Sequence, residues 1–421
     1  MDVIIADVIG EVALVLIVSS LLGTVAARLG QPRVVGQIVA GIMLGPTVLG
    51  HLPGHLTSRL FPEATLSAMT ILANVAVVVF MFVVGYELDF SSLRGVRRAA
   101  PMVAGAALLV PMALTIGTLF LFRTGFQSAG APHHLTRSFL LFMGVALSIT
   151  AMPVLASIVR ERGIAGTTAS NIATAAAGIM DVLAWLVLAA ALVGTAHAPG
   201  RPLTLTMFLL VAFTAAMLLV IRPALRALIG RTEFPLSSRA PVALALALGS
   251  AWVTATLGLH PVFAGFLAGL TMPRNAGEPD AGVIRQMEDI GNLLLPLFFV
   301  VTGLSLAIGS LDGDTFAILA LVCALATVGK VGPAYAASRA AGLAPRDSAA
   351  VAVLVNTRGL TELIALNVGL TDGIINRRMF SILVLMALVT TLGTAPVLSW
   401  FRLGVPAMPE PERVPAVHPA P

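Results

Sequence analysis

The sequence predicts an all-α polytopic membrane protein, and three observations carry that prediction. Hydrophobic residues make up 58% of the 421 residues and charged residues only 11%, whereas soluble domains carry roughly 25% charged residues. The apolar residues form long runs, which suit transmembrane helices of about 20 residues. Arginines gather at the ends of these runs, as orientation signals do. The net charge of +5 therefore does not indicate a nucleic-acid partner.

About thirteen apolar segments follow one another along the chain. The second, eighth and ninth are short or interrupted by glycine and proline. The acidic start MDVIIADVIGEVAL lacks the basic region of a signal peptide, so the first segment is expected to remain as a helix. The predicted segments are 7–27, 34–50, 64–86, 100–122, 138–159, 167–195, 203–222, 240–257, 261–273, 286–308, 315–338, 348–370 and 379–401.

The distribution of arginines predicts the orientation in the bilayer. If the N-terminus lies outside, most arginines fall in the inner loops, and an odd number of crossings leaves the C-terminus in the cytoplasm. Residues 403–421 are rich in proline, and we expect a short disordered cytoplasmic tail with no regulatory domain after the membrane part. The single cysteine, Cys323, rules out an intramolecular disulfide.

One acid stands out inside these segments. Asp181 is the only charged residue between Asn171 and Ala196, and an ionised carboxylate in hydrocarbon costs roughly 2.5 to 3.5 kcal/mol on insertion scales. The candidate partner is Lys330, which is the only lysine and lies in the middle of its own apolar run. Two alternatives stay open: a purely structural Asp181–Lys330 pair, and a Lys330 side chain that snorkels to the membrane surface.

Two segments are broken near their centres. The fifth, GVALSITAMPVLASIV, is interrupted at Ser148 and Thr150, and the twelfth, LVNTRGLTELIALNVG, at Asn356 and Thr357. Breaks in these two positions of thirteen predict two six-helix repeats of inverted orientation around a linker helix, as in secondary transporters. Irregular backbone at that depth must be buried or line a cavity.

Arg358 lies within the second break, and Glu362 follows one helical turn later on the same face. The two side chains either form an internal salt bridge that supports the broken helix or contact a bound ion directly. Glu87 and Asp89, at the end of the third segment, are likewise either topological charges or ligands.

Binding at Asp181 by either a proton or a small cation is the chemistry that these residues favour. Burial and a nearby ammonium act on this carboxyl in opposite directions, so a proton and a cation can compete for it. Ser148, Thr150 and carbonyls freed at the two breaks would supply further oxygen ligands. No cofactor is expected, and no metal site, because His133 and His134 have no acids close in sequence.

Six stretches, in order, resemble the monovalent cation:proton antiporter-2 family of the sodium/proton exchanger superfamily. Within it the chain is most similar to the plant-type cation/proton exchangers and their bacterial relatives. The resemblance covers about residues 10 to 400, and the stretches are QPRVVGQIVAGIMLGPTVLG, FMFVVGYELDF, ALSITAMPVLASIVRERG, PLFFVVTGLSL, GKVG and NTRGLTELIALNVG.

The resemblance implies a homodimer of thirteen-helix protomers within residues 1–402. It assigns 1–99 and 240–310 to scaffold and dimer helices, 100–200 and 315–402 to a moving core, and 203–222 to the linker. The fifth and twelfth helices would cross beside the acid of the sixth. Asp181 then matches the ion-binding acid, Thr150 the polar break and Lys330 the basic residue of the eleventh helix.

The chain departs from the family at Met180, where relatives have Asp or Asn. Gln37 replaces a usual Glu, and Tyr86 a usual Leu. Because methionine cannot bind a proton, Met180 leaves one acid for exchange and favours an electroneutral ratio. The same departure keeps open a protein of this fold without exchange: a regulator, a leak pathway or an exporter of organic solutes.

The expected function is secondary active exchange of Na+ or K+ for protons, in what we expect to be a bacterial plasma membrane. The sequence does not choose between the two cations, because ligand number and cavity size decide that preference. An enzyme is disfavoured, because an intramembrane aspartyl protease needs a second acid to share a proton with Asp181.

Overall fold

The computed structural model describes residues 2–29, 31, 33–51, 53, 56–87, 98–192, 203–229, 238–257, 260–275, 278–306 and 313–400. Asp89 and the predicted tail lie outside the described residues. Within the described part the fold is helical throughout, apart from one isolated bridge between Asn275 and Glu278.

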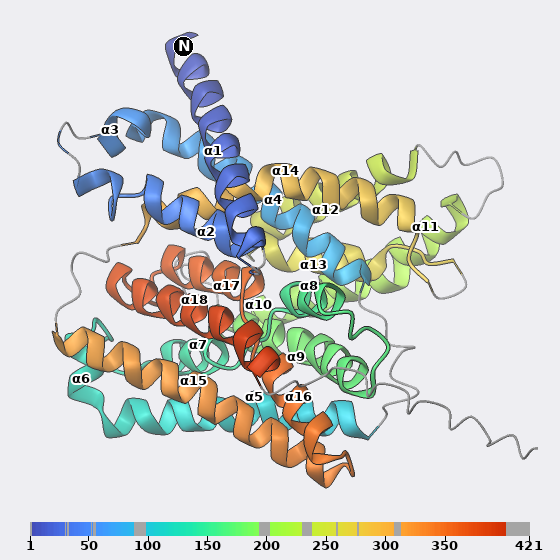
Figure 1. Cartoon of the computed structure of the whole chain (residues 1–421). Helices are drawn as coiled ribbons and strands as arrows, with labels where there is room; N and C mark the ends of the chain where they lie inside the picture. Colours follow the sequence, from blue (N-terminus) through green and yellow to red (C-terminus); the bar gives the residue numbers. More distant parts are fainter. Residues whose placement is uncertain are drawn as a thin grey trace, which may run out of the picture.

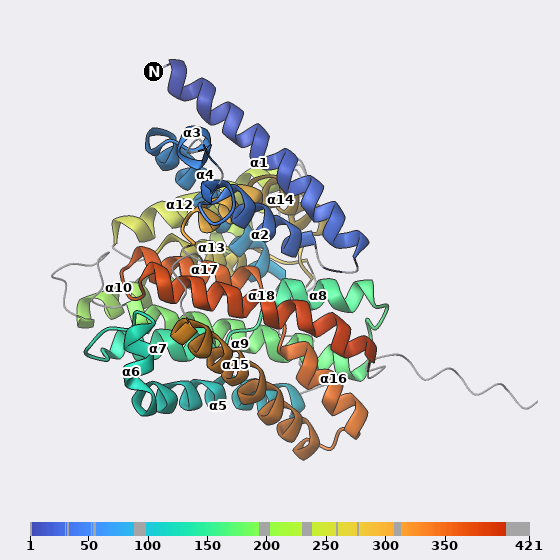
Figure 2. The same cartoon turned by 60° about the vertical axis from the view of Figure 1, so that its left-hand side comes forward.

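The helices form two layers, which both views separate (Figures 1 and 2). One layer packs α4 against α13 and α14, with α1, α2 and α12 around them. Its elements are α1 (Asp2–Arg28), α2 (Arg33–Leu44), a 3-10 turn (Leu49–His51), α3 (Leu56–Leu60), α4 (Glu63–Glu87), α12 (Arg239–Thr256), α13 (Pro261–Thr271) and α14 (Ala281–Leu304).

The other layer packs α15 against α5 and α16, and α9 against α5, α7 and α16. Its elements are α5 (Ala99–Leu121), α6 (Arg123–Ser128), α7 (Arg137–Ala146), α8 (Met152–Glu161), α9 (Thr168–Leu192), α15 (Gly313–Ala340), α16 (Pro345–Val355), α17 (Leu360–Thr371) and α18 (Arg377–Trp400). The chain passes between the layers through α10 (Leu203–Ala216), a π-helical turn (Met217–Ile221) and α11 (Arg222–Ile229).

Every predicted segment contains helix, but the count of thirteen crossings is not confirmed. Nine spans in the described residues are long and apolar enough to cross a membrane, with α16 and α17 together forming one of them. The remaining predicted segments hold α2, α12, α13 and the pair α7 and α8, which are short or broken. Length and composition alone therefore cannot count them as crossings.

Glycines allow the first layer to pack with its backbones in contact. A Cβ atom on Gly41 of α2 would lie 2.1 Å from the carbonyl oxygen of Phe299 in α14, and one on Gly303 would lie 2.1 Å from the backbone of Gly41. Such close approach is the usual role of small residues between membrane helices. The α2–α14 crossing thus has no room for a side chain.

Tyr86 joins three parts of the same layer at the end of α4. Its hydroxyl donates to the Pro273 carbonyl oxygen at 2.8 Å and accepts from the Asp280 backbone N–H at 2.9 Å. The Arg274 guanidinium donates to the Tyr86 carbonyl oxygen at 2.8 Å, and Arg239 forms an ion pair with Asp280 at 2.7 Å. A leucine at this position could form neither of these two hydrogen bonds. The hydrogen bonds of the Tyr86 hydroxyl therefore explain why a tyrosine stands here.

The glycine contact predicts a position-specific loss of stability. We expect Gly41→Ala to destabilise the protein by about 1 to 3 kcal/mol, because the added methyl overpacks a backbone contact. Gly105→Ala is the matched control, since no atom lies within 4 Å of a Cβ at that helical position; it should be neutral or stabilising. Thermal unfolding in detergent measures both, and equal midpoints for the two variants would contradict the packing argument.

Candidate functional site

The two helix breaks meet in the second layer. The first lies between α7 and α8, the second between α16 and α17. The Thr150 hydroxyl donates to the Val355 carbonyl oxygen at 2.8 Å, and the Ala151 backbone N–H donates to the Thr357 carbonyl oxygen at 3.0 Å. Each break therefore provides hydrogen-bond partners for backbone groups that have no helical partner in the other break. Backbone groups buried in a membrane protein require such partners.

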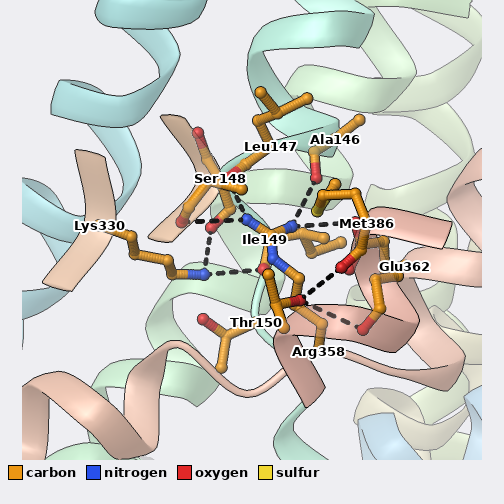
Figure 3. A network of polar contacts seen from close by, with 12 residues as sticks. Ala146, Leu147, Ser148, Ile149, Thr150, Lys330, Arg358, Glu362 and Met386 are labelled. Atoms are coloured by element: carbon orange, nitrogen blue, oxygen red, sulfur yellow. Dashed lines mark hydrogen bonds and ion pairs between the residues drawn. The ribbon is translucent and has the colours of Figure 1, made fainter. Parts of the chain in front are cut away.

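Two buried cationic side chains donate hydrogen bonds to four consecutive backbone carbonyl oxygens at the end of α7 (Figure 3). The Lys330 ammonium donates to the carbonyl oxygens of Ser148 at 2.6 Å and Ile149 at 2.7 Å. The Arg358 guanidinium donates to those of Ala146, at 3.0 Å, and Leu147. A helix C-terminus carries partial negative charge, so both cations stabilise it. Sequence reasoning did not predict that side chains would take these carbonyls.

Arg358 also forms the ion pair that its spacing from Glu362 indicated. Its guanidinium lies 2.9 Å from the Glu362 carboxylate, and both side chains are fully buried. The Thr391 hydroxyl of α18 donates to the Arg358 carbonyl oxygen at 2.9 Å. Arg358 thus ties α7, α17 and α18 together, which favours the structural reading over direct contact with an ion.

Asp181 lies on α9 with 0% of its surface exposed, and neither carboxylate oxygen has a hydrogen-bond partner among the described residues. Lys330 donates to the carbonyls instead, and in the described part of the chain no ion pair joins it to Asp181. The Asn356 side-chain oxygen is likewise buried without a partner. Buried oxygens without a hydrogen bond are costly. The Asp181 oxygens are therefore the natural candidates for binding a proton or a cation, and the Asn356 oxygen for binding a cation.

Met180 is fully buried beside the acid, and its sulfur lies 3.9 Å from the Thr150 hydroxyl oxygen. The residue next to Asp181 is therefore a weak hydrogen-bond acceptor and cannot bind a proton. The Ser148 hydroxyl lies in the break and donates back to the Gly144 carbonyl oxygen of α7 at 2.7 Å. Among the hydroxyls expected near the ion, that of Thr150 is the one that bridges the two breaks.

A cavity of about 480 Å³ lies between the two layers. It reaches the first residues of α8, Met152 and Pro153, and the first residue of α17, Leu360. Polar residues of the first layer also line it, namely Arg33, Glu87, Glu288 and Asn292. Sequence reasoning missed Glu288 and Asn292, although the charged stretch QMED at the start of the tenth apolar segment marks that helix end.

Known proteins that are similar to this chain are exchangers and antiporters. A family model described as "Sodium/hydrogen exchanger, transmembrane" matches residues 14–401. The chain is 37% identical to cation/H(+) antiporter 20 of Arabidopsis thaliana, over 92% of this chain and 47% of that protein. It is 32% identical to the Na(+)/H(+) antiporter NhaS4 of Synechocystis, over 92% of this chain and 95% of the relative. The chain thus spans about half the length of the plant relatives it matches.

A solved structure shares the fold. The sodium proton antiporter MjNhaP1 of Methanocaldococcus jannaschii superposes with a TM-score of 0.70, covering 95% of this chain and 98% of that one at 16% identity. This likeness confirms the predicted sodium/proton antiporter fold.

The buried ion pair predicts non-additive stability effects. We expect Arg358→Ala and Glu362→Ala each to cost about 3 to 5 kcal/mol, because each leaves an uncompensated buried charge. The double variant should be more stable than the sum of the single losses, while still weakened by the lost carbonyl bonds of Arg358. Thermal stabilities of the four proteins in detergent test this, and strictly additive effects would remove the energetic pairing.

Proposed function

The chain belongs to the sodium/hydrogen exchanger family, and from that premise we propose that it is a secondary active transporter that exchanges Na+ or K+ for protons. The observation that carries the proposal is the buried carboxylate of Asp181, which has no hydrogen-bond partner among the described residues and lies in a layer where two broken helices meet. A transporter is proposed rather than an enzyme, because the matched relatives carry the names of antiporters.

Asp181 is the proposed site of competition. Its free oxygens bind a proton in one half of the cycle and a monovalent cation in the other. The Thr150 hydroxyl and the unpaired Asn356 oxygen are proposed as further ligands, since hard cations prefer oxygen. Ser148 is a weaker candidate, because its hydroxyl already donates to the Gly144 carbonyl oxygen of α7.

Alternating access is proposed to occur by movement of one layer against the other. Residues 1–99 and 240–310 are the proposed scaffold and dimer helices, 100–200 and 315–402 the moving core, and 203–222 the linker. The cavity of about 480 Å³ between the layers supports this division. At the far end of α17, Asn367 donates to the Thr302 hydroxyl of α14 at 3.2 Å, a contact that movement would have to break.

Electroneutral one-for-one exchange is the proposed ratio. Met180 cannot bind a proton, so Asp181 is the one acid of the predicted two-acid position. The Lys330 ammonium donates to two carbonyls, and such bonds are stronger for a charged donor. Lys330 is therefore proposed to keep its proton throughout the cycle, as a structural cation rather than as a transported charge.

The protein is an integral membrane protein, and the finer placement is proposed. The arginine distribution supports an N-terminus outside and a C-terminus in the cytoplasm. A bacterial plasma membrane is proposed from the resemblance to the bacterial members of the antiporter-2 family. The resemblance to the antiporter-2 family supports a homodimer. A protein of the same fold without exchange is not favoured, because the matched relatives are named as cation/proton antiporters. That alternative predicts that the unmodified protein moves no protons in response to a cation.

Removing the charge of Asp181 tests the central proposal. We expect Asp181→Asn to abolish cation-induced proton release in proteoliposomes for Na+, K+ and Li+, because the amide cannot exchange a proton. Thermal stability and gel filtration should show a folded protein. Asp289→Asn, an exposed change on α14, is the matched control and should exchange normally. Near-normal exchange by Asp181→Asn would refute the assigned role.

Restoring a second acid tests the ratio. We expect the unmodified protein, under a clamped pH gradient, not to respond to an imposed membrane potential. Met180→Asp should make transport respond to that potential, because a second titratable group allows two protons to move per cation. Potential-driven transport by the unmodified protein would show that the one-acid explanation is wrong.

A further inference from the structure

A second cavity of about 580 Å³ lies between α1, α2 and α14. Its polar lining comprises Ser19, Ser20, Thr24, Arg33, Gln37 and Asn292. The apolar part of its lining includes Leu21 and Leu293, whose side chains are 63% and 58% exposed. Hydrogen-bond donors, one cation and an exposed apolar wall thus share a single cavity.

Close packing of α1 on α2 fixes the polar side of this cavity. A Cβ atom on Gly36 would lie 2.2 Å from the Leu22 carbonyl oxygen, so the two backbones touch. Arg33 and Gln37 lie one turn apart on α2, as Ser20 and Thr24 do on α1, so each pair shares a helical face. The Ser19 hydroxyl is fully buried along the cavity and has no partner among the described residues.

The charge and the position of this cavity identify its occupant. Arg33 forms no ion pair with any residue that the structure describes, and a guanidinium binds phosphate through two parallel hydrogen bonds. α1 ends at Arg28 and α2 begins at Arg33. In the proposed orientation, this connection between the two helices lies at the cytoplasmic surface of the membrane. Anionic lipids are concentrated in that leaflet. Exposed leucines beside the polar lining suit acyl chains better than a soluble anion.

We propose that this cavity, hereafter the Arg33 groove, binds the headgroup of an anionic glycerophospholipid, with Arg33 on its phosphate. Ser20, Gln37 and Asn292 supply hydrogen bonds to the headgroup, and Leu21 and Leu293 contact the acyl chains. The Thr24 hydroxyl already donates to the Ser20 carbonyl oxygen at 2.8 Å and only lines the groove.

The Arg33 groove adjoins the cavity between the layers. Arg33 and Asn292 line both, and Glu87 and Glu288 line the inner one. The Arg33 guanidinium, which has no ion-pair partner among the described residues, repels a cation that enters the inner cavity and opposes the attraction of the two glutamates. The phosphate of a lipid bound in the Arg33 groove compensates the positive charge of Arg33. Bound lipid therefore lowers the cation concentration needed for half-maximal exchange, a consequence that rests on the proposed exchange function.

Binding is tested first, without transport. Purified protein in neutral detergent is titrated with phosphatidylglycerol, and thermal unfolding reports binding, because a ligand of the folded state raises the midpoint. We expect Arg33→Gln to weaken the apparent lipid affinity about fivefold, the contribution of one basic residue near an anionic surface. Arg33→Lys should retain most of the response. Arg28→Gln, five residues away and outside both cavities, is the matched control and should respond like the unmodified protein.

Transport is then measured in proteoliposomes of neutral phosphatidylcholine, with and without phosphatidylglycerol. Exchange is measured with Na+ and with K+. The unmodified protein and Arg28→Gln should show a lower apparent KM for the exchanged cation when the anionic lipid is present, whereas Arg33→Gln should have the same KM in both. Since Arg28→Gln experiences the same surface potential, it separates a bound lipid from general surface charge. An absence of exchange in every protein would refute the proposed function and leave the binding result standing.

Three results would overturn the lipid proposal. The first is an equal response of Arg33→Gln and Arg28→Gln to phosphatidylglycerol in the unfolding assay. The second is an equal rise of the midpoint with inorganic phosphate, which would make the groove a site for free anions. The third is efficient cross-linking of Leu21→Cys between two copies that phosphatidylglycerol does not reduce, which would assign the groove to a second copy of the chain.

Discussion

The buried end of α7 is the constraint on which the rest of this structure depends. A helix that stops inside a membrane leaves carbonyls that neither water nor the next turn can satisfy. Arg358 and Lys330 donate to four of them in succession, from residue 146 to residue 149. Both donors come from the second half of the chain, so the first break cannot be satisfied until that half has packed against it. The two halves are therefore interdependent in folding as well as in geometry.

The same arrangement accounts for the isolation of Asp181. The Lys330 ammonium donates to two carbonyls rather than to Asp181, whose carboxylate remains without a hydrogen bond in the described part of the chain. Glu362 pairs with Arg358, which leaves that acid neutralised. Of these two buried acids, one is thus held in a structural ion pair and the other is left available. The difference is one of direct contact: Glu362 touches the Arg358 guanidinium, whereas Asp181 makes no such contact among the described residues.

Sequence reasoning succeeded where the determinant is local. Apolar run lengths located the helices, and polar residues inside apolar runs located both breaks. The spacing of Arg358 and Glu362 indicated a shared helical face. The partners of Lys330 could not be predicted in this way, because Ser148 and Ile149 lie 182 and 181 residues away and meet it only through tertiary packing. The number of crossings also remained open, since α2 and α13 are too short for length to decide.

Cavity residues illustrate the same limit. Arg33 and Asn292 are ordinary polar residues near helix ends in the sequence, and only the packing of α2 against α14 makes them a common wall of two cavities. No periodicity or motif encodes that adjacency. The role of Tyr86 is similar, because its hydroxyl partners, Pro273 and Asp280, lie in a distant connection before α14.

The contact between Gly41 and Gly303 has a consequence for sequence variation in this layer. In an ordinary core, a larger residue on one helix can be accommodated by a smaller residue on its neighbour. Here both positions already hold the smallest residue, and the atoms in contact are backbone atoms. No compensating partner substitution exists, so change at either position can only separate the helices. The crossing of α2 and α14 can therefore be lost during evolution, but it cannot be rebuilt with a different pair of side chains.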